Sequence, residues 1–156
     1  MAEIKLTNSS SVAIIDDSDK GIVDKFKWRA VKGRNTYYAA STIDGKPVLM
    51  HRMILGIKGR YNHVDHKNGN GLDNRRENIR LCSCSQNNIN RPKYKNNRAG
   101  IKGVNTFKNG KFGARITIGG KLIHLGTFST SEEAGRAYDK FARIHHGEFA
   151  NLNFSD

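Results

Sequence analysis

The sequence predicts an α+β protein: a mixed β/α N-terminal region leads into a polar central segment, and a three-stranded antiparallel sheet packed on one helix follows. The dipeptides Asn109-Gly110 and Gly119-Gly120, each flanked by alternating residues, predict the sheet, because they suit two-residue turns with positive φ. Thr130 and Glu133 form a capping-box pattern at the start of the predicted helix. Short apolar runs between turn-prone segments predict the N-terminal strands.

The N-terminal region, residues 1 to about 60, contains three such apolar runs, at Val12–Ile15, Tyr37–Ala40 and Val48–Met50. We expect a strand at each run and a short helix within Asp16–Phe26. Trp28 is interpreted as a core aromatic residue, because a tryptophan in such a setting more often packs inside than stacks on a base.

The C-terminal strands have one apolar and one polar face. Between the two turns the apolar positions are Phe112, Ala114, Ile116 and Ile118, and the third strand adds Ile123 and Leu125 to that face. Leu122 and His124 fall on the opposite face.

A helix over about 131–146 covers the apolar face, and Gly147 ends it. The residues at helical spacing that we expect against the sheet are Ala134, Ala137, Tyr138, Phe141 and His145.

The charge of the chain predicts a polyanionic partner. There are 27 Lys and Arg against 14 Asp and Glu, a net charge of +13, and from Arg91 to Ser129 no residue is acidic. Such an excess indicates DNA or RNA. A membrane partner is not expected, because no basic helix carries a continuous apolar face. Without a signal peptide or a spanning segment in the sequence, we expect the protein in the cytoplasm, in a bacterial or phage-infected cell.

The two cysteines, Cys82 and Cys84, do not predict a zinc site. A C-x-C spacing without a second pair lacks the four ligands of a tetrahedral site, and such near neighbours are poorly placed for a disulfide. We expect reduced, packed thiols and no structural zinc.

The central segment, about 61–90, is rich in His, Asn, Asp and Arg, so polar contacts or a metal must hold it together. Asp65, His66 and Asn87 are residue types that phosphodiester hydrolysis needs. A carboxylate and an amide oxygen suit Mg²⁺, which keeps several waters, and a neutral imidazole suits a base near neutral pH. Asn88 competes with Asn87 for the ligand role, and the spacing favours Asn87.

Four pieces of this segment, in order, resemble the ββα-metal motif of HNH homing endonucleases in the version that begins Asp-His: Val64-Asp65-His66, Asn68-Gly69-Asn70, Leu72 to Arg80 and Ser85 to Asn88. The resemblance implies that Asp65 and Asn87 hold Mg²⁺ or Mn²⁺ and that His66 deprotonates the attacking water. It also implies that Asn78 hydrogen-bonds across the loop to orient His66.

Met50-His51-Arg52-Met53-Ile54 resembles the segment that precedes this motif in phage and intron relatives. There His51 and Arg52 would open a short helix, and Arg52 would contact a DNA phosphate. A capping or surface role for His51 is an equal alternative.

The last third, about 101–154, resembles the plant ethylene-response-factor (apetala-two type) DNA-binding domain. The motifs are Lys102-Gly103-Val104, Leu125-Gly126-Thr127-Phe128, Ser131-Glu132-Glu133-Ala134, Ala137-Tyr138-Asp139 and Asn151-Leu152-Asn153-Phe154. The resemblance implies a sheet that enters the major groove of double-stranded DNA. The DNA-binding residues that we expect are Arg52, Lys102, Asn105, Arg115, Thr117 and His124.

The sequence therefore predicts an endonuclease domain over 1–90, a basic linker over 91–100 and a DNA-binding domain over 101–156. We expect a homing-type, Mg²⁺-dependent DNA endonuclease that leaves 5′-phosphate and 3′-hydroxyl ends and works as a monomer or homodimer. Two alternatives stay open: a non-catalytic DNA-binding regulator, and a ribonuclease, since charge does not distinguish the nucleic acids.

Overall fold

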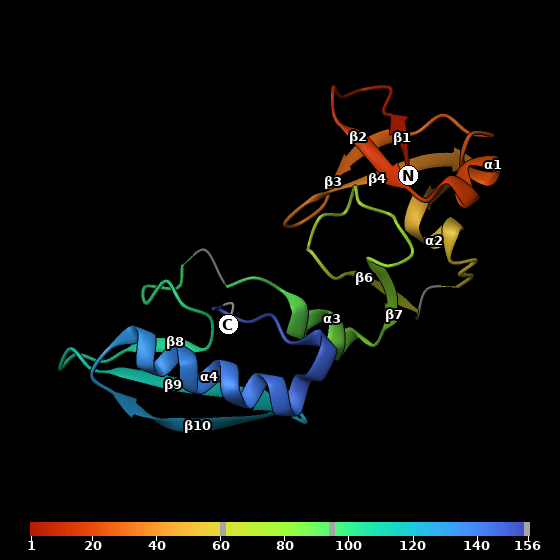
Figure 1. Cartoon of the computed structure of the whole chain (residues 1–156). Coiled ribbons are helices and arrows are strands. Elements are labelled where there is room, and N and C mark those ends of the chain that lie inside the picture. Colours follow the sequence, from red (N-terminus) through yellow and green to blue (C-terminus); the bar gives the residue numbers. More distant parts are fainter. Residues whose placement is uncertain (60–61, 94–95, 155–156) are drawn as a thin grey trace. The chain divides into compact units, whose positions relative to one another are not determined.

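The computed structural model describes residues 1–59, 62–93 and 96–154. Position 61 of the predicted central motif, positions 94–95 of the predicted linker and positions 155–156 of the C-terminal domain lie outside the described residues. The chain divides into two compact units, Met1–Asn87 and Asn88–Asp156, with the division inside helix α3 (Cys84–Asn90) (Figure 1).

The first unit begins with two small antiparallel sheets. One pairs β1 (Ala2–Lys5) with β2 (Val12–Ile15), and the other has β4 (Tyr37–Ile43) between β3 (Arg29–Lys32) and β5 (Lys46–Leu49). Strands therefore form at all three predicted apolar runs. Met50 is an exception within them, because it begins helix α2 (Met50–Ile54) instead of ending a strand. The helix expected within 16–26 is a 3-10 turn, η1 (Asp17–Asp19), followed by α1 (Lys20–Val23).

The core of the first unit forms around Trp28, which is 1% exposed, as expected of a core aromatic residue. Its indole Nε1 donates a hydrogen bond to the carbonyl of Val23 at 2.9 Å. Met50 and Ile54 of α2 are buried in the same cluster. Helix α2 is therefore anchored in the core despite its short length.

Strands β6 (His63–His66) and β7 (Ile79–Cys82) pair antiparallel, and α3 follows β7. The long loop between them is fastened to β2. The amide of Ile14 donates to the carbonyl of Leu72 at 2.8 Å, and the amide of Asn74 donates to the carbonyl of Ile14 at 2.7 Å. This loop therefore has a defined position, because its backbone bonds are made to a core strand.

The second unit is a three-stranded antiparallel sheet, with β9 (Phe112–Ile118) between β8 (Val104–Thr106) and β10 (Lys121–Phe128). Helix α4 (Ser131–His146) lies along one face of the sheet (Figure 1), and a 3-10 turn, η2 (Gly147–Phe149), follows it. The predicted capping box is confirmed. Thr130 Oγ1 accepts from the amide of Glu133, whose carboxylate accepts from the amide of Thr130.

The two hairpin turns of this unit differ. Gly119 and Gly120 both have positive φ, 57° and 79°, as expected for a two-residue turn. At Asn109-Gly110 only the glycine has positive φ, 78°, and the amide of Phe107 donates to the carbonyl of Lys111. The prediction of a two-residue turn there was wrong, because the chain forms a longer loop with glycine at its left-handed position.

The face of α4 that packs on the sheet also differs from the expected one. Ala134, Tyr138 and Ala142 are buried, whereas Phe141 is 37% exposed and stacks on His145 with ring centroids 6.0 Å apart. The buried stripe is therefore turned away from Phe141 and His145. Among the described helices, α4 is the longest at 16 residues, and none has the length and apolar character needed to cross a membrane.

Candidate active site and nucleic-acid interface

Strand β6 carries Asp65 and His66 into the interior of the first unit, and each side chain is 5% exposed. Asp65 lies opposite Arg80 of β7 in the strand register. Arg80 Nη2 and Nε both donate to Asp65 Oδ2, at 2.8 and 2.9 Å. The guanidinium therefore compensates a carboxylate charge that would be costly to bury alone.

His66 is held in an environment that favours its neutral form. Burial lowers the pKa of His66, while the adjacent Asn74 side chain and the negative charges of Asp65 and Asp73 act in the opposite direction. Asn74 is fully buried, and its Nδ2 donates to the carbonyl of Leu72 at 3.0 Å. A neutral imidazole can accept a proton, which is the property a general base needs.

Two further rings contact His66. The His51 ring meets it edge to face, with centroids 4.9 Å apart and planes at 85°, and the Tyr38 ring lies 5.7 Å away. His51 is 5% exposed on α2, and burial, then the charges of His66 and Arg52, lower its pKa to about 3. Sequence reasoning left His51 between a helix-opening and a surface role, and it did not single out Tyr38.

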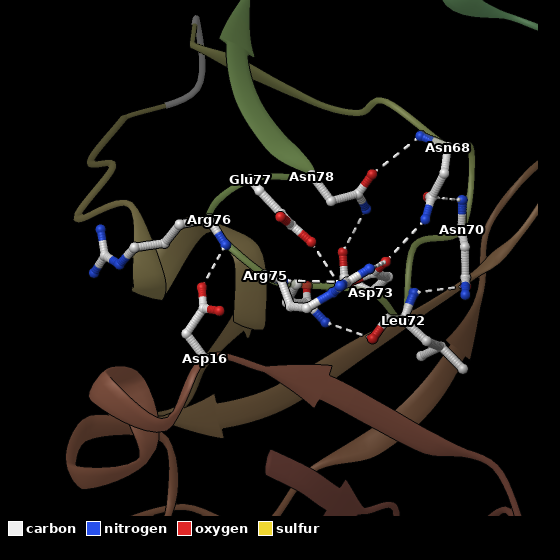
Figure 2. A network of polar contacts seen from close by, with 10 residues as sticks. Asp16, Asn68, Asn70, Leu72, Asp73, Arg75, Arg76, Glu77 and Asn78 are labelled. Carbon is white, nitrogen blue, oxygen red and sulfur yellow. Dashed lines mark hydrogen bonds and ion pairs between the residues drawn. The ribbon is translucent and has the colours of Figure 1, made fainter. Parts of the chain in front are cut away.

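Asn78 closes the loop that separates the two strands (Figure 2). Its Oδ1 accepts from the amide of Asn68 at 3.0 Å, and its Nδ2 donates to the carbonyl of Asp73 at 2.7 Å. Its own carbonyl accepts from the amide of Lys67 at 2.9 Å. These bonds cross the loop and tie down the chain directly after His66, and the orientation of His66 by Asn78 stays a prediction.

The rest of the loop is stabilised by charged groups, as the composition of the segment predicts (Figure 2). Asp73 accepts from Arg75 Nε and Nη2 at 2.8 and 2.7 Å, and this contact with Arg75 is the main cause of its lowered pKa. Arg76 Nη2 donates to Asp19 Oδ1 at 2.6 Å, and the Arg76 amide donates to Asp16. Polar contacts therefore replace the apolar core that this segment lacks.

The remaining candidate ligand, Asn87, is half-buried on α3, where its amide donates to the carbonyl of Ser83 at 3.0 Å. Within the described part of the chain, no three His, Cys, Asp or Glu side chains are grouped to hold a metal ion. The donors that the sequence predicts are one carboxylate, that of Asp65, and one amide oxygen, that of Asn87. This chemistry fits a hard cation such as Mg²⁺, which takes few protein ligands and keeps its waters.

The two cysteines near the site are not bridged to each other. Cys82 is buried, and burial is the main cause that raises its pKa to about 11, whereas Cys84 is exposed.

The second unit presents polar side chains on the sheet face opposite α4. Arg115 and Thr117 are exposed on β9, and His124 is exposed directly across from Arg115 on β10. Asn105 of β8 lies opposite Gly113 on the same face. Side chains that are opposite in an antiparallel pair share a face, so four of the expected DNA-binding residues form one surface.

The other two expected DNA-binding residues bind to the protein itself. Arg52 Nη1 donates to the carbonyl of Asn62 at 2.7 Å, and Nη2 donates to that of Gly59. Lys102 Nζ donates to the carbonyls of Ile89 and Arg91, and burial is the main cause that lowers its pKa to about 8. These contacts give Arg52 and Lys102 structural roles, and we do not include them in the proposed DNA-binding face.

Comparison with known proteins adds to this geometry. Residues 56–89 match the profile of the HNH endonuclease family. The chain is 32% identical over 140 residues to the uncharacterized HNH endonuclease L560 of Acanthamoeba polyphaga mimivirus, an alignment that covers 86% of this chain and 71% of that protein.

Plant transcription factors give shorter matches. The chain is 43% identical over 61 residues to the ethylene-responsive transcription factor ERN3 of Medicago truncatula, across 38% of this chain and 26% of that protein. It is 56% identical over 36 residues to an ethylene-responsive transcription factor-like protein of Arabidopsis thaliana, across 23% and 16%. These matches span only a small part of the plant proteins.

Proposed function

We propose, from the premise that this chain belongs to the HNH endonuclease family and is a DNA-cleaving hydrolase, that it is a Mg²⁺-dependent endonuclease acting on duplex DNA and leaving 5′-phosphate and 3′-hydroxyl ends. One observation carries the proposal. Asp65 and His66 are consecutive buried residues of β6, and Asn78 ties down the loop directly after them.

In this proposal His66 is the general base. Its buried imidazole is neutral at working pH and takes a proton from the attacking water. The carboxylates of Asp65 and Asp73 favour the imidazolium that results, because each acts to raise the pKa of His66. Asn78 holds the loop between β6 and β7, and therefore the start of β7, in a fixed position through its hydrogen bonds to Asn68 and Asp73.

Asp65 and Asn87 would hold the divalent cation, Mg²⁺ or Mn²⁺. A bound cation at such a site neutralises charge on the phosphate and on the departing 3′ oxygen. Arg80 keeps the Asp65 side chain in a single orientation through two hydrogen bonds to Oδ2. A carboxylate fixed in this way is a preorganised ligand, which lowers the entropic cost of binding an ion.

The second unit would bind the DNA, with Asn105, Arg115, Thr117 and His124 facing the major groove. The support is their common face, the short matches to plant transcription factors, and the absence of acidic residues in the sequence from Arg91 to Ser129. A sheet can carry side chains into a major groove of B-form DNA. The deep, narrow major groove of A-form RNA disfavours a ribonuclease.

The resemblance to HNH homing endonucleases extends the proposal to a homing-type enzyme, and we expect it to act in the cytoplasm of a bacterial or phage-infected cell. One catalytic motif makes one cut. A monomer would therefore nick DNA, whereas a homodimer would break both strands.

The test is incubation of supercoiled and linear DNA with the purified protein and Mg²⁺, beside EDTA and the His66→Ala variant. Cutting that disappears in both controls supports the proposal. Binding without cutting by the wild-type protein would identify a DNA-binding regulator instead, and cleavage of a matched RNA substrate alone would identify a ribonuclease.

A further inference from the structure

We propose that His51 is a positioning residue that holds the imidazole of His66 in one orientation. The inference rests on the proposed base role of His66. It assigns a role to the Met50-His51-Arg52 motif, which the metal site and the DNA-binding face leave unused.

The contact between the two rings is direct. Their centroids are 4.9 Å apart with an interplanar angle of 85°, and both side chains are 5% exposed. Edge-to-face aromatic contacts at such distances are favourable beyond their area burial. A buried ring that meets another in this way restricts its rotation, so the His66 ring nitrogens keep a defined direction.

Tyr38 contacts both histidine rings. Its ring lies 5.6 Å from the His51 ring and 5.7 Å from the His66 ring. Gly33 and Gly71 flank Tyr38 so closely that a Cβ at either position would come within 2.4 and 2.5 Å of its ring. The absence of side chains at these two positions lets Tyr38 occupy this place.

The helix that carries His51 is itself fixed. Met50 is 0% and Ile54 4% exposed in the core. Arg52 of the same helix binds the carbonyls of Gly59 and Asn62, directly before β6. Helix α2 is therefore tied both to the core and to the segment that enters the strand of His66.

His51 acts through its ring in this arrangement. Within the described residues, its buried Nδ1 has no hydrogen-bond partner. The low pKa of its imidazole keeps it uncharged, so it does not repel an imidazolium at position 66. A phenylalanine at position 51 should consequently preserve the orientation of His66, whereas an alanine should not.

The test compares the full-length variants His51→Ala and His51→Phe with Ile54→Val, which removes a buried methylene from the same helix. We expect His51→Ala to slow single-turnover cleavage about 10 to 100-fold, the usual cost of losing a supporting group around a site. DNA affinity, measured with Ca²⁺ in place of Mg²⁺, should not change. His51→Phe and Ile54→Val should keep the wild-type rate.

The second readout is the Cε1–Hε1 NMR resonance of His66 in the protein without DNA. It should move and broaden in His51→Ala but stay narrow in His51→Phe and Ile54→Val. A wild-type rate and an unchanged His66 resonance in His51→Ala would overturn the inference, as would a His51→Phe variant as slow as His51→Ala. If the wild-type protein cuts no DNA, the base role fails, and the NMR comparison alone still decides whether His51 orients His66.

Discussion

Asp65 and Arg80 form an ion pair across β6 and β7, with Nη2 2.8 Å from Oδ2 and with side chains 5% and 10% exposed. The carboxylate that we expect to bind the cation is thus also part of the structure that holds the two strands together. The stability of the first unit and the proposed metal binding therefore depend on the same carboxylate.

Replacing Arg80 should therefore destabilise the first unit. Arg80→Ala leaves a buried carboxylate without its guanidinium partner, which costs about 3 to 5 kcal/mol in comparable ion pairs. The measurement is urea denaturation followed by the fluorescence of Trp28, the one tryptophan of the sequence, which is buried in this unit. Adding Asp65→Asn should recover part of the loss. If the free energy of unfolding of Arg80→Ala lies within about 1 kcal/mol of the wild-type value, the ion pair contributes no more than an exposed ion pair does.

Asn78 should be needed for the order of the loop. Asn78→Ala removes the acceptor of the Asn68 amide and the donor to the Asp73 carbonyl, and unsatisfied buried groups cost about 1 to 3 kcal/mol each. We expect faster hydrogen exchange over residues 67–78 and slower DNA cleavage. Glu77→Ala is the matched control, because the Glu77 side chain is 70% exposed. Equal effects of the two substitutions would contradict a specific role for Asn78.

Acid should destabilise the first unit through its buried histidines. The pKa of His51 is lowered from 6.5 to about 3, mainly by burial. Between these two pH values the His51 imidazole is therefore protonated in the unfolded chain and neutral in the folded chain. Stability is complete above the unfolded pKa and falls with decreasing pH, by up to about 1.4 kcal/mol per pH unit.

The measurement is again urea denaturation followed by Trp28 fluorescence, from pH 7 to pH 4. His51→Phe cannot titrate, so its stability should depend less steeply on pH than that of the wild type. Parallel curves for the two proteins would exclude His51 as a source of the acid sensitivity.

Arg115 should contribute to DNA binding. Arg115→Ala is expected to cost about 1 to 3 kcal/mol of binding free energy if Arg115 reads a base, and to reduce the salt dependence if it contacts a phosphate. Fluorescence anisotropy at several salt concentrations distinguishes the two. Lys140→Ala is the control, because Lys140 is exposed on α4, on the other side of the sheet. An unchanged affinity in Arg115→Ala would count against this face as the reader of DNA.

Local patterns predicted most elements of the fold because their causes are local. The glycine pair at 119–120 and the capping box of Thr130 and Glu133 depend on backbone conformation within a few residues. The face of α4 that packs on the sheet was harder to predict from the sequence. Ala142 and Phe141 are neighbours in the sequence, and the packing of α4 on the sheet decided that the small residue is buried.

The sequence by itself determined the family of nucleases to which the chain belongs and the chemical groups from which the proposed site is built. Only the tertiary structure decided their partners. It placed Arg80 on Asp65 and His51 against His66, and it turned Lys102 toward backbone carbonyls. These contacts join residues that are distant in the chain, and neither residue of such a pair carries a local pattern that specifies the other. These contacts form because a charged or polar group that is buried away from water must find its partner wherever the fold provides one.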